Sequence, residues 1–182
     1  MAPAPSEAPA DAQPFSAAGG GAVPIPSHLA RFWRRFVAVA GPVDDTRFYE
    51  AFSFGDSPAM ADELAALVLR GTKRATAGSL WSFEAHGKRL PVPGDLSIVT
   101  GGSGAPLCII ETRAVDIVPF DEVDAGFAAA EGEGDGSLPY WRDAHRQYFA
   151  RECARDGREF SGRMPVVCER FDVVYQPAAP VR

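Results

Sequence analysis

The residues best suited to chemistry lie in the short stretch Arg70-Gly71-Thr72-Lys73-Arg74-Ala75-Thr76, where a helix-like pattern gives way to a strand-like one. A loop held between rigid elements can aim its side chains accurately. Lys73 stands out because the chain has only one other lysine, Lys88, among many arginines. Lysine can lose its proton in a suitable environment, whereas arginine cannot. The stretch is either a functional loop or a helix end followed by solvated charges.

A window rich in basic residues surrounds this loop, within a chain whose net charge is −6. Bulk electrostatic coating of nucleic acid is excluded, since that mode needs an extended basic face. A local basic rim suits a small anionic or nucleotide-sized ligand, although many such clusters are simply solvated faces. Trp81 lies in the same window and could stack on a base, or belong to the core. The predicted ligand-binding residues from this window are Gly71, Arg74, Trp81, Lys88 and Arg89.

Length and composition predict one soluble domain. The chain has 182 residues and 46% hydrophobic residues, enough for one sizeable core. No apolar run approaches the roughly 20 residues that a membrane-spanning helix needs, and no signal-like segment begins the chain. The three cysteines are widely spaced without a C-x-x-C pair, and the histidines lack metal-ligand spacing. We therefore expect a cytoplasmic protein without a cofactor.

The periodicity divides the chain into helices and strands. Residues 1–24 resemble a disordered tail and residues 177–182 a loose end, while 25–51 form a helical extension led by an apolar stripe from Leu29 to Ala40. A second helix is expected to be capped by Ser57 or Asp56, and a third by Ser137. Strands are expected over residues 75–82, 96–100, 107–112, 114–120 and 165–175, and a short helix over 121–130. Because the connections are short, the sheet should be antiparallel.

Several ordered motifs make residues 52–176 resemble the ASCH domain family, specifically its YhfF-like branch. They are Phe54-Gly55-Asp56-Ser57, Gly71-x-Lys73-x-x-Thr76, Pro93-Gly94-Asp95, Val118-Pro119-Phe120, Ala130-Glu131-Gly132-Glu133-Gly134 and the segment Met164 to Phe171. The resemblance implies an α+β fold, a small antiparallel PUA-like β-barrel with flanking helices. It also implies that the partner is RNA or a modified nucleoside.

The same resemblance implies two activities. Some ASCH proteins are amidohydrolases that remove the acetyl group of acetylated cytidine with a lysine, a threonine and a glutamate. These roles fall here on Lys73, Thr76 and Glu133, with Glu131 as the alternative carboxylate. Another member is a metal-dependent ribonuclease, for which a divalent cation would be required.

The residue types fit amide hydrolysis. A threonine hydroxyl attacks a carbonyl only after a neighbouring base takes its proton. Lys73 can be that base if burial or a nearby cation such as Arg74 lowers its pKa. The residues leave open three readings: catalysis, noncatalytic RNA or nucleotide binding, and a structural salt bridge between Lys73 and Glu133. Glu131, Glu133 and Asp135 could also hold a cation, although acidic glycine-rich loops are usually solvated.

Overall fold

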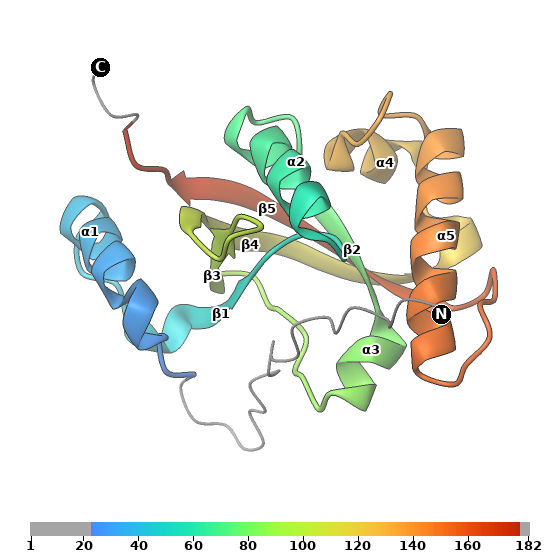
Figure 1. Ribbon diagram of the computed structural model, residues 1–182, viewed down its shortest axis with the longest axis horizontal. Helices are drawn as coiled ribbons and strands as arrows, with labels where there is room; N and C mark the ends of the chain where they lie inside the picture. The colour runs from blue at the N-terminus through green and yellow to red at the C-terminus, as the bar shows by residue number, and fades with distance from the viewer. Residues whose placement is uncertain (1–22, 179–182) are drawn as a thin grey trace, which may run out of the picture.

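A five-stranded mixed sheet forms the centre of the protein in the computed structural model, which describes residues 23–178 (Figure 1). The strand order is β1-β3-β4-β5-β2. Strand β1 pairs with β3 in parallel, and the other neighbours are antiparallel. The strands are β1 (Phe48–Phe52), β2 (Ala75–Ser79), β3 (Leu96–Thr100), β4 (Pro106–Pro119) and β5 (Pro165–Tyr175).

Two features of this sheet correct the prediction. The sheet is open, with β1 and β2 at opposite edges, so a closed barrel is not confirmed. It is also not purely antiparallel, because residues 48–52 form the parallel strand β1 at the end of the segment expected to be a helical extension. Strand β1 can pair in parallel with β3 because the connection between them is long and contains two helices, α2 (Pro58–Leu69) and α3 (Leu80–Ala85). The predicted tails lie almost entirely outside the described residues.

Within residues 23–178, five α-helices and three short 3-10 helices surround the sheet. In Figure 1, α1 lies at one end of the sheet, α4 and α5 lie at the other, and α2 lies between them. The α-helices are α1 (Ala30–Ala40), α2 (Pro58–Leu69), α3 (Leu80–Ala85), α4 (Ala125–Glu131) and α5 (Leu138–Arg155). The 3-10 helices are η1 (Ser27–Leu29), η2 (Asp45–Arg47) and η3 (Phe120–Glu122).

Side-chain caps set the starts of the helices that border the site. Ser57 accepts a hydrogen bond from the amide of Met60 at the start of α2, and Pro58 occupies the first turn. Ser137 caps α5 in the same way through the amide of Tyr140. Both caps agree with the prediction. The expected strand 75–82 is shorter, because Ser79 ends β2 and Leu80 begins α3.

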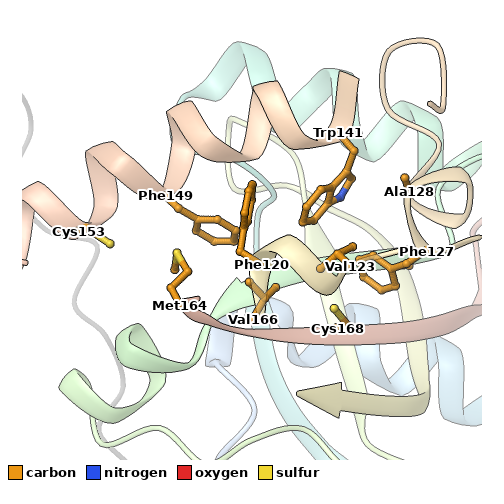
Figure 2. Packing of buried hydrophobic residues seen from close by; sticks show 11 residues of the cluster. Phe120, Val123, Phe127, Ala128, Trp141, Phe149, Cys153, Met164, Val166 and Cys168 are labelled. Atoms are coloured by element: carbon orange, nitrogen blue, oxygen red, sulfur yellow. The ribbon is translucent and has the colours of Figure 1, made fainter. Parts of the chain in front are cut away.

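Apolar side chains of α4 and α5 pack on β5 and η3 to form one of three buried clusters (Figure 2). Trp141 stacks on Phe120 with ring centroids 5.3 Å apart, and Phe149 meets Phe120 edge-on. Burial of such aromatic side chains is worth about 2 kcal/mol or more each. This packing fixes α5 against the sheet, and α5 in turn carries one wall of the candidate site.

Candidate functional site

A cavity of about 410 Å³ lies where α5, α2, α3 and the loop after β1 meet the β2–β5 edge of the sheet. Its volume falls in the range of small-molecule sites. Four predicted residues line it: Thr76, Lys88, Glu131 and Glu133. The aromatic rings of Phe52, Phe54, Phe83 and Tyr148 also contribute to its wall.

Lys73 lies directly behind this cavity. Its side chain is 1% exposed, and its Nζ donates to Glu131 Oε1 at 3.0 Å and to Glu133 Oε1 at 2.7 Å. The ring of Phe54 lies 5.3 Å from the same ammonium. Glu133 is 18% exposed and reaches the cavity, whereas Glu131 is as buried as Lys73. The structure thus brings Lys73, Glu131 and Glu133 into one buried ion cluster.

Close backbone contacts bring these distant segments together. The amide of Arg74 donates to the carbonyl of Ala130 at 2.7 Å, which ties the loop after α2 to the end of α4. Gly132 follows with φ +63°, and a Cβ there would meet the carbonyl oxygen of Thr72 at 2.6 Å. Only glycine fits both conditions. The glycine between the two glutamates therefore lets both carboxylates reach Lys73.

Glu131 has three partners in addition to its burial. Lys73 binds one carboxylate oxygen, while the other accepts a hydrogen bond from Trp141 Nε1 and lies 3.1 Å from His145 Nε2. Burial opposes ionisation of Glu131, but Lys73, His145 and Trp141 together hold its pKa well below the usual range. Glu131 is therefore a charged carboxylate that anchors the cluster, and Glu133 is the one more open to the cavity.

Lys73 does not have the lowered pKa that the sequence suggested. Burial by itself lowers the pKa of Lys73, but the carboxylates of Glu131 and Glu133 outweigh it and raise the pKa above its ordinary value. Arg74 cannot lower the pKa of Lys73 as expected, because the side chain of Arg74 is 59% exposed and lies near Asp172. Lys73 is therefore an ammonium at neutral pH in this arrangement.

Thr76 lies on β2 directly opposite Glu169 of β5. Residues paired across an antiparallel ladder project from the same face of a sheet, and both line the cavity. Glu169 Oε1 accepts a hydrogen bond of 2.6 Å from Thr112 Oγ1 on β4. Burial is the main reason that the pKa of Glu169 is raised to about 7, with the carboxylates of Glu50 and Asp95 adding to it.

Sequence reasoning missed Glu169, although a signal was present. Glu169 is two residues before Phe171 in β5, and so lies on the strand face that carries Phe171 and Val173. A carboxylate on an otherwise apolar face requires a partner or a function. That pattern alone could have nominated Glu169 for the site.

The predicted basic rim is not assembled as an open anion site. Lys88 pairs with Glu50 at 2.6 Å, and Arg89 makes two bonds to Asp95, at 2.6 and 3.0 Å. The positive charges of Lys88 and Arg89 are therefore already paired with carboxylates. Arg74 likewise lies 3.6 Å from Asp172.

Two further predicted residues also lie away from the cavity wall. Gly71 ends α2 with φ +76°, a conformation that favours glycine. Trp81 is half-buried on α3 against a core cluster, and the guanidinium of Arg158 lies 5.1 Å from its ring centre. Neither residue lines the cavity. Their predicted ligand contacts have no support in this geometry.

The cavity wall is acidic. Its carboxyl side chains outnumber its two basic ones, Lys88 and Arg151, and each basic residue is already paired with a carboxylate. Such a wall disfavours a phosphate and favours a neutral or cationic ligand rich in hydrogen-bond donors. The wall carboxyls are Glu50, Glu131, Glu133, Glu152 and Glu169.

A profile of the ASCH domain matches residues 50–175. The chain belongs to the ASCH domain family. The ASCH fold is PUA-like and of an RNA-binding type. The match does not separate branches of the family, so the YhfF-like assignment stays a prediction. The ASCH match covers β2 to β5, most of β1, α2 to α5 and every wall of the cavity, while α1 lies outside it.

Two solved structures resemble the chain closely. The ASCH domain from Lactobacillus crispatus JV V101 has a TM-score of 0.78 and 35% identity, covering 84% of this chain and 97% of that one. A DUF984 protein from Enterococcus faecalis V583 has a TM-score of 0.73 and 34% identity, covering 80% and 86%. No protein with curated annotation shows significant similarity to the chain.

Two features that would indicate other functions are absent from residues 23–178. No cluster of three or more histidine, cysteine, aspartate or glutamate side chains in this range has a metal-binding arrangement. No helix in this range is long and apolar enough to cross a membrane.

Proposed function

We propose that this ASCH protein binds the base of a modified nucleoside in the cavity and hydrolyses the amide of an N(4)-acetylcytidine-type substrate. The carrying observation is that Thr76 and Glu133 line one cavity while Lys73 binds Glu133 from behind. An acidic wall with aromatic rings suits a neutral base better than a phosphate. The substrate is a free nucleoside or a nucleoside within RNA.

The resting protonation states suggest how the groups divide the work. Glu133 accepts the hydroxyl proton of Thr76 as Oγ1 attacks the amide carbonyl carbon. The bond from that carbon to N4 then breaks, and the same proton passes to the leaving amine. Water hydrolyses the threonine ester and releases acetate. Lys73 stays an ammonium and positions Glu133, which differs from the base role that its sequence context suggested.

Thr76→Val and Glu133→Gln test this proposal with N(4)-acetylcytidine, read by chromatographic separation of cytidine. Turnover should fall by roughly two to four orders of magnitude in each variant, the range that general acid–base groups supply, while substrate affinity is kept. Thr72→Val is the matched control, because Thr72 is exposed and does not line the cavity. Parent protein that binds the nucleoside without hydrolysing it would refute the catalytic assignment.

A noncatalytic RNA-binding module is the second candidate, and a different surface favours it. Arg31, Arg34 and Arg35 are exposed on α1, and none of them forms an ion pair with a residue between 23 and 178. Their spacing of three and four residues places them along one side of the helix. Free guanidinium groups arranged this way suit phosphate contacts. An RNA backbone would bind this surface of α1 rather than Arg74, Lys88 and Arg89, which are already paired with carboxylates.

A further inference from the structure

We propose that Glu169 determines specificity in this cavity, with its carboxyl group donating a hydrogen bond to ring nitrogen N3 of a bound cytosine-type base. The inference rests on the proposed function for the class of ligand, but it concerns recognition rather than hydrolysis. Glu169 would then select a base with an acceptor at this position over one with a donor.

The position of Glu169 relative to Thr76 supports this assignment. The two residues are antiparallel partners on β5 and β2, so their Cβ atoms are about 4.5–5.5 Å apart on one face of the sheet. If Thr76 Oγ1 approaches the acyl carbon on N4, the carboxyl of Glu169 lies alongside the edge of the base that carries N4. N3 is the ring atom next to the carbon that bears N4, and it is an acceptor in cytosine.

One oxygen of Glu169 is already committed. Thr112 Oγ1 donates to Oε1 from β4, and Thr112 does not line the cavity. Among residues 23–178, no donor reaches Oε2 within hydrogen-bond distance. A hydroxyl donor on Oε1 makes that oxygen an acceptor, so a proton held by the carboxyl resides on Oε2. Glu169 thus has one oxygen available to a ligand, and its protonation decides whether that oxygen donates or accepts.

The charged surroundings determine when Oε2 carries its proton. Burial is the largest influence and raises the pKa of Glu169 to about 7. Glu50 on β1 and Asp95 before β3 raise it as well, while Thr112 and Lys88 lower it. Lys88 lowers it only in part, because Glu50, which raises it, pairs with the same ammonium at 2.6 Å.

Further groups surround these neighbours. Arg89 neutralises Asp95 through two hydrogen bonds, and the hydroxyl of Tyr49 donates to the carbonyl of Arg89. Burial keeps that phenol protonated by raising the pKa of Tyr49. Across the cavity, Glu131 is held by Lys73 and His145. Glu169 is therefore a cavity carboxyl that changes its charge near neutral pH, with its pKa of about 7.

This protonation change gives opposite preferences for two bases. Below about pH 7, a protonated Glu169 donates to N3 of cytosine. Uracil carries a hydrogen on N3, which suits an ionised carboxylate instead. A site with a misplaced donor or acceptor discriminates strongly because the buried group is left unpaired.

The test is calorimetric binding of cytidine, 3-deazacytidine and uridine at about pH 6 and about pH 8, on either side of the titration. Cytidine should bind the parent about tenfold more weakly at the higher pH, equivalent to one hydrogen bond. Uridine should show the reverse trend. 3-Deazacytidine, which lacks the N3 acceptor, should bind weakly and show no fall with pH.

Glu169→Gln provides the decisive variant. Thr112 donates to the amide oxygen of such a glutamine, so the amide nitrogen occupies the position of Oε2 and donates at every pH. Cytidine should therefore keep its low-pH affinity within about threefold at both pH values. Unchanged pH dependence in Glu169→Gln would overturn the proposal.

Two other cavity residues serve as matched controls. Glu152 lines the cavity from α5 and has a pKa raised chiefly by burial, while His145 lines it beside Glu131. Glu152→Gln and His145→Gln should retain the parental pH dependence, and loss of it in either would overturn the proposal. Measurements of hydrolysis test the proposed function separately. Nucleoside binding that depends on Glu169, without turnover, refutes only the proposed function. Turnover with pH-independent nucleoside binding refutes only this inference. Absence of binding by all three nucleosides refutes the inference outright.

Discussion

Two walls of the same cavity use a lysine and carboxylates in opposite ways. On one wall, Lys73 is fully buried between Glu131 and Glu133, and Lys73 and Glu131 are both charged. On the other wall, Lys88 is partly exposed and committed to Glu50, which leaves Glu169 with a pKa of about 7. The difference follows from which carboxylate the lysine reaches, since burial opposes ionisation on both walls.

This contrast shows why residue type does not determine protonation state. Lys73 has two carboxylate partners within 3.0 Å and therefore has a raised pKa despite complete burial. In the described part of the chain, the hydrogen-bond partner of Glu169 is the hydroxyl of Thr112, and a hydroxyl cannot replace a cation. A cavity with a charged wall and a titrating wall can hold one ligand and respond to pH at the same time.

Removing the buried ammonium should have the largest effect on stability. Lys73→Met would leave Glu131 and Glu133 buried or half-buried without their cation, and we expect a loss of about 3–5 kcal/mol in the free energy of unfolding. Chemical denaturation at neutral pH measures this loss. Lys88→Met is the matched control: its ion pair with Glu50 is partly exposed, so about 1 kcal/mol or less should be lost. Equal losses in the two variants would remove the distinction between the walls.

The next effect concerns the pH dependence of stability. The folded pKa of Glu169 is about 7, above the ordinary value of 4.5 for a glutamate, so the folded state binds more protons between these values. Its contribution to stability is therefore complete below about pH 4.5 and is lost as pH rises through about 7, at up to about 3 kcal/mol. Glu169→Gln should remove this loss.

Urea unfolding of parent and Glu169→Gln at several pH values provides the measurement. Glu131→Gln should act on the acid side instead, because the pKa of Glu131 is lowered in the folded state and its contribution is lost as pH falls. Ionisation of Glu169 should lower the stability of the parent between about pH 5 and pH 7. A rise of the same size in the parent over this range would contradict the assignment.

Much of the fold could be predicted because local signals were strong. The caps at Ser57 and Ser137 matched the structure, and the expected alternation in β5 holds as far as Val173, after which a register shift turns Tyr175 to the opposite face, against α1. Strand β1 was missed because it is five residues long and its partner β3 lies more than 40 residues away in sequence. The open sheet was missed for the same reason, since pairing at the edges depends on contacts that no local pattern records.

The site divides in a similar way. The motif positions led to Lys73, Thr76 and Glu133, and the structure places them around one cavity. The expected pKa of Lys73 was wrong because it depended on Arg74, the neighbour in sequence, whereas the actual neighbours are Glu131 and Glu133. Glu169 was missed because its environment comes from β1, β3 and β4. Electrostatic environment is a tertiary property, and only its most regular hints are visible in sequence.

The smallest expected effect concerns Arg74, which follows Lys73 in the chain but points outward. Arg74 lies 3.6 Å from Asp172 with most of its side chain exposed, so Arg74→Ala should change stability by less than about 1 kcal/mol. Arg74→Ala should also leave the salt dependence of RNA binding nearly unchanged.

Arg31→Ala, Arg34→Ala and Arg35→Ala should each reduce the slope of RNA affinity against salt concentration by about one phosphate contact if α1 is the RNA surface. Fluorescence anisotropy with a structured RNA at several salt concentrations compares the two sets. A reduced slope in Arg74→Ala with no change in the α1 variants would return RNA binding to the window around Lys73, and would show that the pairing with Asp172 gives way to phosphate.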